Sequence, residues 1–380
     1  MNFNFFLKTD ISIGRKEFLK IPDHVSDLGS VRPGIIYDFN LLGNEYFTDN
    51  IEMIKKRFPQ STIVVNDLNK EPTYSYLEKK KYELNDSKPD LIIAIGGGST
   101  IDLGKGIALL LKNDVPALQL KGFPINLNNP LPLITVPSIF GSGSEVSYNA
   151  VFIDENEGKK LGINTRKNFP AKSIIDPELT MTVPMSAVIS SAFDTLVHCI
   201  DSFGSVKSTP LSQIFSIEGF HRTFSSLKKD NLDEENSRIN LAIGSICGII
   251  ALMNSGDGPT NGFAYYFGVK DEIPHGLAGG IFLKEVMDWN FKKGFNDYSK
   301  LIKSRSIKSE KEANRQLFKD LNILYEKYDI PDLSHFGYKK NQVQELANKS
   351  SESLAGSFSG NPIPFDQNSA IDVINNLIKN

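Results

Sequence analysis

Two residue types that often carry function are scarce in this sequence. Its 380 residues include two cysteines, Cys199 and Cys247, and five histidines. Two cysteines are too few for a disulfide framework and are typical of a reducing compartment, so we expect a cytoplasmic location. Because histidine is scarce, a histidine at a stiff or patterned position becomes a functional candidate.

An excess of charge of one sign and long hydrophobic runs are also missing. The chain has 42 Lys and Arg against 45 Asp and Glu, a net charge of −3. Nucleic-acid binders usually show a basic stripe instead. No apolar run reaches the ~18 residues of a membrane span, and the first residues lack the pattern of a signal peptide. We therefore expect a small-molecule substrate, with neither nucleic acid nor membrane as a partner.

The length and the texture of the chain predict two domains. A single core stops growing at about 250–300 residues. From Gly34 to Gly98, continuously apolar runs alternate with polar, helix-compatible segments, as in parallel strands covered on both faces. After Pro184, apolar residues recur at helical spacing. We predict an α/β Rossmann-like, dinucleotide-binding domain at residues 1–183 and an all-α domain at residues 184–380.

Three successive glycines end one of the apolar runs. Gly96, Gly97 and Gly98 are followed by Ser99 and a helix-compatible segment. Backbone amides in such a turn can approach a pyrophosphate, and the helix dipole favours its charge. The spacing matches neither GxGxxG nor the P-loop, so a tight turn without a ligand is the alternative. Lys105, two turns into the helix, is expected to be a surface charge.

Two further segments suit a nucleotide. Asp38 follows an apolar run, where a carboxylate accepts hydrogen bonds from a ribose and repels a 2′-phosphate, which favours NAD over NADP. A solvated turn aspartate is the alternative. The loop that contains Ser138, Gly141, Ser142 and Gly143 is rich in small residues with hydroxyls. Such a loop can lie flat against a polar ligand.

The helical half contains a patterned pair and one stiff corner. Asp194 and His198 stand four residues apart, so on a helix they share one face and could reach one metal ion. A hydrogen bond along the helix is the alternative. Asp201 is in position to orient the His198 imidazole or to face solvent. His275 lies between a proline and a glycine, a corner that presents a side chain to a cleft.

These segments together resemble one family. Similar motifs occur in the same order in the iron-containing alcohol dehydrogenases, through GGGSTIDLGKG, TVPSIFGSGSEVS, KKLGI, IIDPELTMTVP, FDTLVHCIDSF and IPHGLAGGIFLKEVMDWN. The resemblance runs from about Ile35 to Asn290. It implies the fold shared by these enzymes and dehydroquinate synthase, a cofactor (NAD, with NADP possible), and a divalent metal, iron or zinc, in the helical domain. It also implies a homodimer paired through an amino-terminal strand such as residues 11–14.

The resemblance assigns roles to individual residues. The residues that it implies for the cofactor are Gly97, Gly98, Ser99, Asp102, Ser138, Ser142 and Lys160. It implies Asp194, His198 and His275 as metal ligands. The family's fourth ligand, a histidine, lies fourteen residues before His275, where this chain has Asn261. An amide oxygen binds iron or zinc less well and favours oxygen-preferring ions. The site either holds a metal weakly or works without one.

The resemblance also implies the reaction. We expect an NAD(P)-dependent oxidoreductase that interconverts an alcohol and an aldehyde or ketone by hydride transfer, with His275 and Tyr265 as catalytic residues. Tyr265 replaces the family's second histidine and could relay a proton if its pKa, ordinarily near ~10, is lowered; a core aromatic is the alternative.

The substrate class follows only from a narrower likeness. Tyr265 and the pair His198–Cys199 are similar to a branch that includes 3-deoxy-octulosonate 8-oxidase, which suggests an acidic sugar in cell-surface polysaccharide metabolism. Two other classes compete with a dehydrogenase. They are a sugar-phosphate cyclase or lyase of the dehydroquinate synthase type, and a nucleotide-binding descendant without catalysis.

Overall fold

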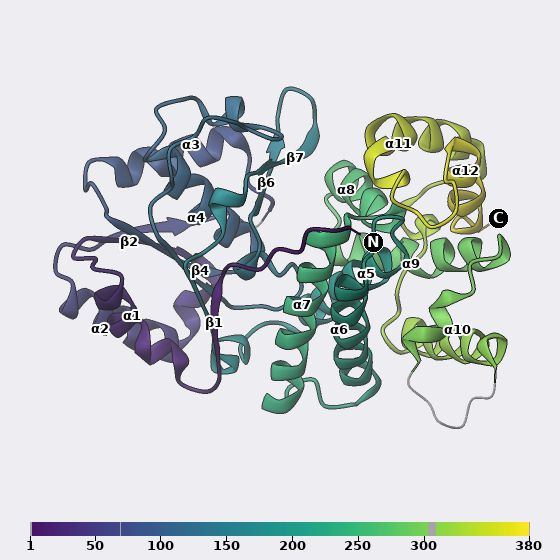
Figure 1. Cartoon of the computed structure of the whole chain (residues 1–380), viewed down its shortest axis with the longest axis horizontal. Helices are drawn as coiled ribbons and strands as arrows, with labels where there is room; N and C mark the ends of the chain where they lie inside the picture. The colour runs from purple at the N-terminus through teal and green to yellow at the C-terminus, as the bar shows by residue number, and fades with distance from the viewer. Residues whose placement is uncertain (1, 69, 303–308, 380) are drawn as a thin grey trace. The chain divides into compact units, whose positions relative to one another are not determined.

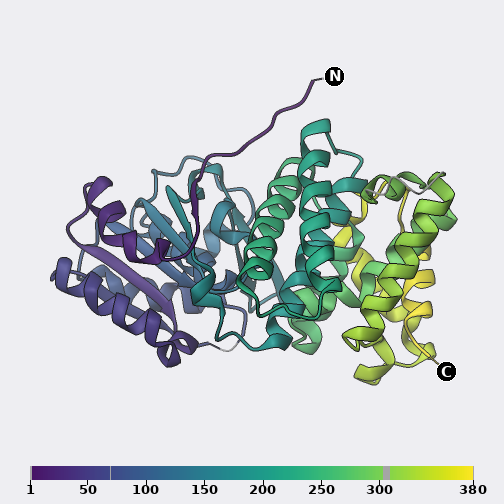
Figure 2. The ribbon, with the colours of Figure 1, turned by 90° about the horizontal axis from the view of Figure 1, so that it is seen from below.

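The computed structural model describes residues 2–68, 70–302 and 309–379. The chain forms two compact units. The α/β unit consists of Leu7–Pro184 and Asp233–Ala242, and the helical unit consists of Met1–Phe6, Met185–Leu232 and Ile243–Asn380. The chain before the first strand is extended (Figure 2).

A six-stranded parallel sheet forms the centre of the α/β unit. Its order is β1-β8-β5-β4-β2-β3, and each neighbouring pair is parallel. The strands are β1 (Asp10–Ile13), β2 (Pro33–Asp38), β3 (Thr62–Asn66), β4 (Leu91–Gly96), β5 (Leu133–Pro137) and β8 (Lys172–Ile175). The predicted parallel sheet is confirmed. A separate antiparallel hairpin, β6 (Asn149–Asp154) and β7 (Lys159–Asn164), was not predicted from the sequence.

Helices cover both faces of this sheet, which explains the continuously apolar strands. The helices are α1 (Ile21–Asp27), α2 (Glu45–Arg57), α3 (Tyr74–Asn85) and α4 (Gly98–Leu110). Figure 1 shows α1 and α2 on one face and α3 and α4 on the other. Ile35 and Ile93 point into the core on the α1 and α2 side, whereas Ile36 and Ile92 belong to the core on the α3 and α4 side. Alternate side chains of each strand are therefore buried on opposite faces.

The helical unit confirms the predicted all-α second half. The helices after Pro184 are α5 (Met185–Gly204), α6 (Pro210–Lys228), α7 (Glu235–Ser255), α8 (Pro259–Asp271), α9 (His275–Lys292), α10 (Glu310–Lys327), α11 (Val343–Phe358) and α12 (Gln367–Asn376). The residues of α7 up to Ala242 belong to the α/β unit, and all the others lie in the helical unit. Helix α5 packs against α6 and α9, and α8 packs against α9 and α11 (Figures 1 and 2). Stacked aromatic side chains such as Phe263 and Phe282 fill the core between α8 and α9.

Helix α7 is long and apolar enough to cross a membrane by length and composition. However, 67% of that apolar window is buried inside the folded chain. Burial of this kind is typical of a core helix, since core helices are apolar on most sides. Among the described residues, α7 is the one helix with these properties.

Candidate functional site

The carboxyl ends of β2 and β4 meet where the direction of the strand order reverses. From β2 the chain proceeds to β3 on one side and then to β4 on the other side. Doubly wound sheets bind nucleotides at this switch point. Asp38 ends β2 and Gly96 ends β4, and a Cβ atom on Gly96 would lie 3.0 Å from the Asp38 Cβ. The structure therefore brings Asp38 and the glycine turn together.

Helix α4 begins inside the glycine turn and has an N-terminus suited to an anion. Its N-cap is Gly97, which offers no side chain to the first amides. The amides of Thr100 and Ile101 donate to the Gly97 carbonyl, at 3.0 and 3.1 Å. The amides of Gly98 and Ser99 precede them, and the first amides of a helix have no acceptor within it. A phosphate group suits this position because these amides and the helix dipole attract negative charge.

The second glycine loop lies directly against this turn. A Cβ atom on Gly98 would stand 2.6 Å from the Ser142 Oγ, so a larger residue at this position would require the Ser142 side chain to shift. The Ser138 amide donates to the Gly96 carbonyl at 3.0 Å, which fastens the start of the loop to the end of β4. The structure thus gathers Gly96, Gly98, Ser138 and Ser142 at one place.

Behind the turn lies a buried network around Lys105. The Lys105 Nζ donates to the Ser144 Oγ and to the Asn149 carbonyl, both at 2.7 Å, and lies 3.5 Å from an oxygen of Asp102. Asp102 also accepts from the amide of Val151 at 2.8 Å. Only 1% of Lys105 is exposed, so the expected surface charge is wrong. The reason is that every face of α4 near Lys105 is covered, as its apolar neighbours could have indicated.

Glu145 is a buried carboxyl that the sequence reasoning missed. It follows Ser144 in the short helix η4 (Ser144–Val146) and is 1% exposed. Burial raises the pKa of Glu145 to about 7, although Lys105 attracts its charged form. Burial likewise raises the pKa of Asp102 and lowers that of Lys105. The Glu145 Oε1 has no hydrogen-bond partner among the residues described.

Asp38 and Lys160, two of the residues predicted to contact the cofactor, have partners of their own in this chain. The Asp38 Oδ1 accepts from the backbone amide and the side-chain amide of Asn40, both at 2.9 Å. Lys160 lies on β7, where its Nζ is 2.9 Å from the Glu71 Oε1. Lys160 thus forms an ion pair with Glu71 within the α/β unit.

Three helices of the second unit bring the predicted ligand residues together. Asp194 and His198 lie one turn apart on α5, Asn261 lies in the first turn of α8, and His275 begins α9. The Asp194 Oδ1 is 3.5 Å from the His198 Nε2 and 3.8 Å from the His275 Nε2. The His275 Nε2 is 3.1 Å from the Asn261 Oδ1. Four donor atoms therefore converge.

A close approach of two backbones explains the glycine after His275. A Cβ atom on Gly276 would lie 2.0 Å from the Ser190 carbonyl oxygen and 2.9 Å from the Asp194 Cβ. No side chain larger than hydrogen fits there without a shift of α9 or α5. Gly276 thus permits the start of α9 to bring His275 beside Asp194.

The spacing of the four donor atoms suits a divalent ion. Four ligands of a tetrahedral zinc site, each about 2.0–2.2 Å from the metal, stand roughly 3.3–3.6 Å apart. The observed separations are 3.1, 3.5 and 3.8 Å. Within the described ranges, no three His, Cys, Asp or Glu side chains form a metal-holding group by themselves. The donor set therefore depends on the Asn261 oxygen.

Asp201 does not orient the His198 imidazole. The His198 Nδ1 is buried and lacks a hydrogen-bond partner in the part of the chain that the structure describes. The Asp201 carboxylate accepts instead from the backbone N–H of Asn261 at 2.9 Å. It takes the place of a side-chain cap for α8, because the N-cap residue is Gly258. Burial raises the pKa of Asp201 to about 7.

Tyr265 lies beside the predicted ligands and also packs in the aromatic core, so its position fits both a proton relay and a core aromatic. Its ring centroid lies 4.9 Å from that of His275, at an angle of 44°. The side chain is partly buried and packs against the aromatic core of the helical unit. It is therefore both a neighbour of the four-residue cluster and a packing residue.

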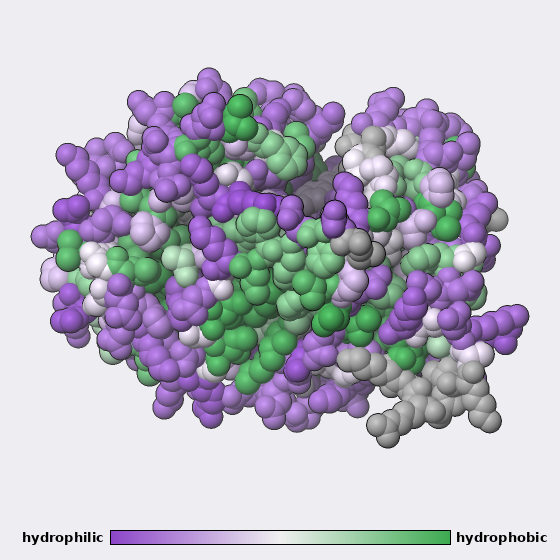
Figure 3. All heavy atoms as spheres, in the orientation of Figure 1, coloured by the Kyte–Doolittle hydropathy of each residue, from purple (hydrophilic) through white to green (hydrophobic). Residues whose placement is uncertain are grey.

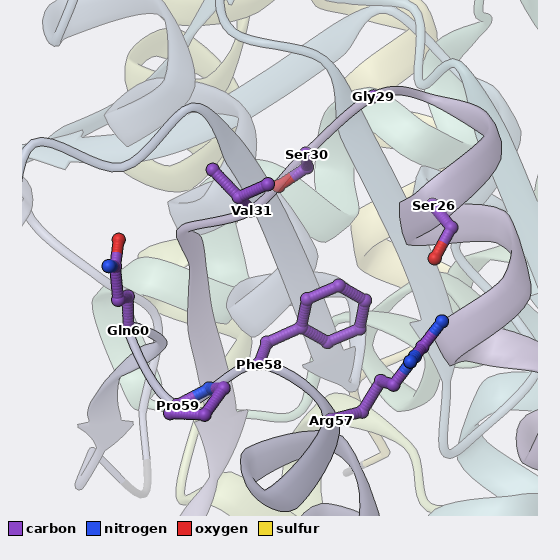
Figure 4. Close-up of a pocket in the computed structure, with 8 residues that line it drawn as sticks. All are labelled: Ser26, Gly29, Ser30, Val31, Arg57, Phe58, Pro59 and Gln60. Atoms are coloured by element: carbon purple, nitrogen blue, oxygen red, sulfur yellow. The ribbon is translucent and has the colours of Figure 1, made fainter.

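An open cavity of about 700 Å³ lies away from these residues. Figure 4 shows it between the end of α1, the loop before β2 and the end of α2, with Ser26, Ser30, Arg57 and Phe58 among its lining residues. It sits at the amino ends of β2 and β3, opposite the glycine turn. Because doubly wound sheets bind ligands at the carboxyl ends, we assign the cavity no part in the site.

Comparison with known proteins identifies the class. Residues 8–177 match the iron-containing alcohol dehydrogenase family, and residues 188–378 match the C-terminal region of the Fe-containing alcohol dehydrogenase family. Long-chain-alcohol dehydrogenase 1 of Geobacillus thermodenitrificans is 29% identical over 303 residues, which cover 75% of this chain and 74% of that protein.

Solved structures share the fold along the whole chain. A 1,3-propanediol oxidoreductase has a TM-score of 0.90 with 19% identity and complete coverage of both chains. Sulfoacetaldehyde reductase from Bifidobacterium kashiwanohense, solved with NAD⁺, has a TM-score of 0.88 with 19% identity over 99% of each chain.

The chain belongs to the iron-containing alcohol dehydrogenase family. It is an NAD(P)-dependent oxidoreductase that interconverts alcohols and aldehydes or ketones.

Proposed function

We propose that this enzyme uses NAD and a divalent metal, with the cofactor on residues 1–183 and the metal and substrate on residues 184–380. The observation that carries the proposal is a chain of close contacts among four possible ligands: Asp194 lies 3.5 Å from His198 and 3.8 Å from His275, and His275 lies 3.1 Å from Asn261. When bound, the metal polarises the alcohol or carbonyl oxygen, and the nicotinamide accepts or donates the hydride.

The cofactor contacts proposed for the α/β unit follow from its glycine turn. The amides of Gly98 and Ser99 bind the pyrophosphate, and Gly97 allows it to approach. The Ser138 and Ser142 hydroxyls line the loop beside it, and Lys160 supplies positive charge. Asp102 does not touch the cofactor in this proposal, because its oxygens hold Lys105, Ser144 and β6.

Asp38 carries the preference for NAD over NADP. Its carboxylate lies beside the glycine turn, where it accepts hydrogen bonds from a ribose and repels a 2′-phosphate. Fluorescence titration with NADH and NADPH tests this role. We expect Asp38→Ala to narrow the preference for NADH by about tenfold, because the like-charge repulsion disappears. An unchanged ratio of the two dissociation constants would remove Asp38 from the site.

In the helical unit, Asp194 supplies the negative charge and the two histidines supply imidazole nitrogens. The Asn261 oxygen completes the set. Tyr265 is proposed to pass a proton between the substrate oxygen and solvent, since it adjoins His275. The variant Tyr265→Phe keeps the packing surface, so kcat should fall about a hundredfold, with a changed pH profile and little change in KM. A pH profile identical to that of the native enzyme would make Tyr265 a packing residue only.

Metal analysis of protein purified without chelator is the decisive experiment, combined with NADH consumption on a panel of aldehydes and ketones. The panel includes an acidic sugar aldehyde, the substrate class suggested by the sequence. We expect stoichiometric metal and net NADH oxidation, with tighter zinc binding in Asn261→His. Net turnover also excludes a cyclase, which returns its NAD unchanged. If the native protein and Asn261→His were both active without metal, the proposed metal would be rejected, whereas hydride transfer would still stand.

We further propose that two copies pair through β1. This strand lies at the edge of the sheet and pairs with β8 on one side. Leu7, just before the strand, is 46% exposed, and Ile13, in the strand, is 39% exposed. Apolar side chains gather on the face that carries the amino-terminal segment (Figure 3). Exposed edges with apolar side chains favour pairing with another strand. The Asp10 and Gly14 amides donate to β8, and amides alternate along a strand, so the Ile11 and Ile13 amides face the open edge. Ile11→Pro removes one of these edge amides, so light scattering should show a monomer if the proposal holds and an unchanged dimer if it does not.

A further inference from the structure

Asn261 has an unusual set of neighbours for a buried amide. It is 1% exposed, and its side-chain oxygen lies 3.1 Å from the His275 Nε2. Its side-chain nitrogen lies 3.4 Å from an oxygen of Asp257, four residues earlier. An ionised carboxylate only accepts hydrogen bonds, so the amide group that faces Asp257 must be the NH₂ group. The amide oxygen then faces His275, whose Nε2 in turn lies 3.8 Å from the Asp194 Oδ1.

Asp257 is itself held in place from a distant part of the chain. The oxygen that accepts from Asn261 also accepts from the Ser357 hydroxyl at 2.8 Å, one hundred residues later in α11. The backbone at Asp257 packs tightly as well, because a Cβ atom on Gly360 would lie 2.1 Å from its carbonyl oxygen. The carboxylate therefore has a fixed position from which to orient the amide.

We propose that Asp257, supported by Ser357, is a positioning residue that turns the Asn261 oxygen towards Asp194 and His275, so that the cluster binds an oxygen-preferring divalent ion. The inference rests on the proposed metal function. If the amide were reversed, its oxygen would face the Asp257 carboxylate and its NH₂ group would face the cluster. Both contacts are unfavourable, since the first opposes two acceptors and the second offers no lone pair to a cation.

The choice of metal follows from this orientation. Imidazole nitrogens suit zinc and iron, whereas carboxylate and carbonyl oxygens suit manganese and magnesium. With the amide oxygen in place, the set has two nitrogens and two oxygens. Loss of the orientation removes one oxygen, so the affinity for Mn²⁺ should fall more than the affinity for Zn²⁺. A general loosening of the structure would weaken both ions equally.

The test is a calorimetric titration of the full chain with Mn²⁺ and with Zn²⁺, for the native protein and two variants of Asp257. Asp257→Leu removes the acceptor, whereas Asp257→Asn keeps an acceptor oxygen of the same size. For Asp257→Leu we expect about a tenfold or larger loss of Mn²⁺ affinity and a smaller loss for Zn²⁺, as for other residues that orient a ligand. Asp257→Asn should stay within about threefold of the native protein for both ions.

A second pair of variants does not depend on the folding of Asp257→Leu. Ser357→Ala removes one support of the carboxylate and should weaken Mn²⁺ binding about threefold, whereas Ser359→Ala, whose hydroxyl bonds to a backbone carbonyl nearby, should leave it unchanged. An Mn²⁺ to Zn²⁺ ratio that is the same in the native protein, Asp257→Leu and Ser357→Ala would overturn this inference alone. Failure of the native protein to bind either ion, while it binds NADH, would overturn the proposed metal as well.

Discussion

The glycine turn and the four-residue cluster are built in different ways. The turn is made from backbone amides and small side chains at one strand-to-helix junction, with one serine loop against it. The cluster is made from side chains on three helices, namely Asp194, His198, Asn261 and His275. A site made of backbone tolerates change at most positions, because any residue supplies an amide. A site made of side chains changes its chemistry with one substitution, as Asn261 illustrates.

The glycine turn should depend little on the side chains behind it. Lys105→Met tests this dependence, because it leaves Asp102 and Glu145 buried without their cation. We expect a loss of about 3–5 kcal/mol in the free energy of unfolding. Urea unfolding measures the loss, and NADH titration shows whether the turn is affected too. Lys112→Met, at an exposed position just after α4, is the control and should stay within about 0.5 kcal/mol.

The cluster should be more sensitive to a misplaced backbone than the turn is. Gly276→Ala would place a Cβ atom 2.0 Å from the Ser190 carbonyl oxygen, so α9 must move. We expect a destabilisation of about 3 kcal/mol and loss of metal binding, with NADH binding retained. Calorimetric melting and metal titration measure these effects. Gly356 lies within α11, where a Cβ atom meets nothing within 4 Å, so Gly356→Ala should leave the fold as stable or slightly more stable. Equal destabilisation by the two variants would contradict the close approach at Gly276.

Glu145 should make the stability of the α/β unit depend on pH. Burial raises the pKa of Glu145 to about 7 in the folded chain, from 4.5. A carboxyl with a raised pKa in the folded state stabilises the fold below about pH 4.5, and this contribution is lost as the pH rises through 7. We expect Glu145→Gln to raise stability at pH 8 by up to about 3 kcal/mol and to have little effect at pH 5. An equal gain at both pH values would mean that the carboxyl is not protonated in the fold.

Local sequence patterns predicted the parts of the molecule that local rules determine. The apolar runs gave the strands β2 to β5, and the spacing of Asp194 and His198 placed them on one helix face. The proline and glycine around His275 marked the start of α9. In each case neighbours in the chain decide the structure, because period and turn chemistry act over a few residues.

The parts that were not predicted depend on residues far apart in the chain. Ser357 lies one hundred residues from Asp257, and no pattern in the sequence joins them. The hairpin of β6 and β7 is packed against α4, which buries Lys105 and takes up Asp102. Lys105 did carry a signal, since apolar residues and glycines surround it in the chain on every face of its helix. A charged residue in such a segment should be expected to be buried and paired.

The glycine turn should tolerate a small side chain at Gly98. Gly98→Ala would place a Cβ atom 2.6 Å from the Ser142 hydroxyl, which can shift because it belongs to a side chain and not to the backbone. We therefore expect about tenfold weaker NADH binding, or about 1.4 kcal/mol, with melting temperature and metal binding nearly unchanged. Gly43→Ala, with open space around it, is the control. If Gly98→Ala instead abolished NADH binding, the cofactor would lie against the glycine itself and the turn would be as intolerant of substitution as the cluster.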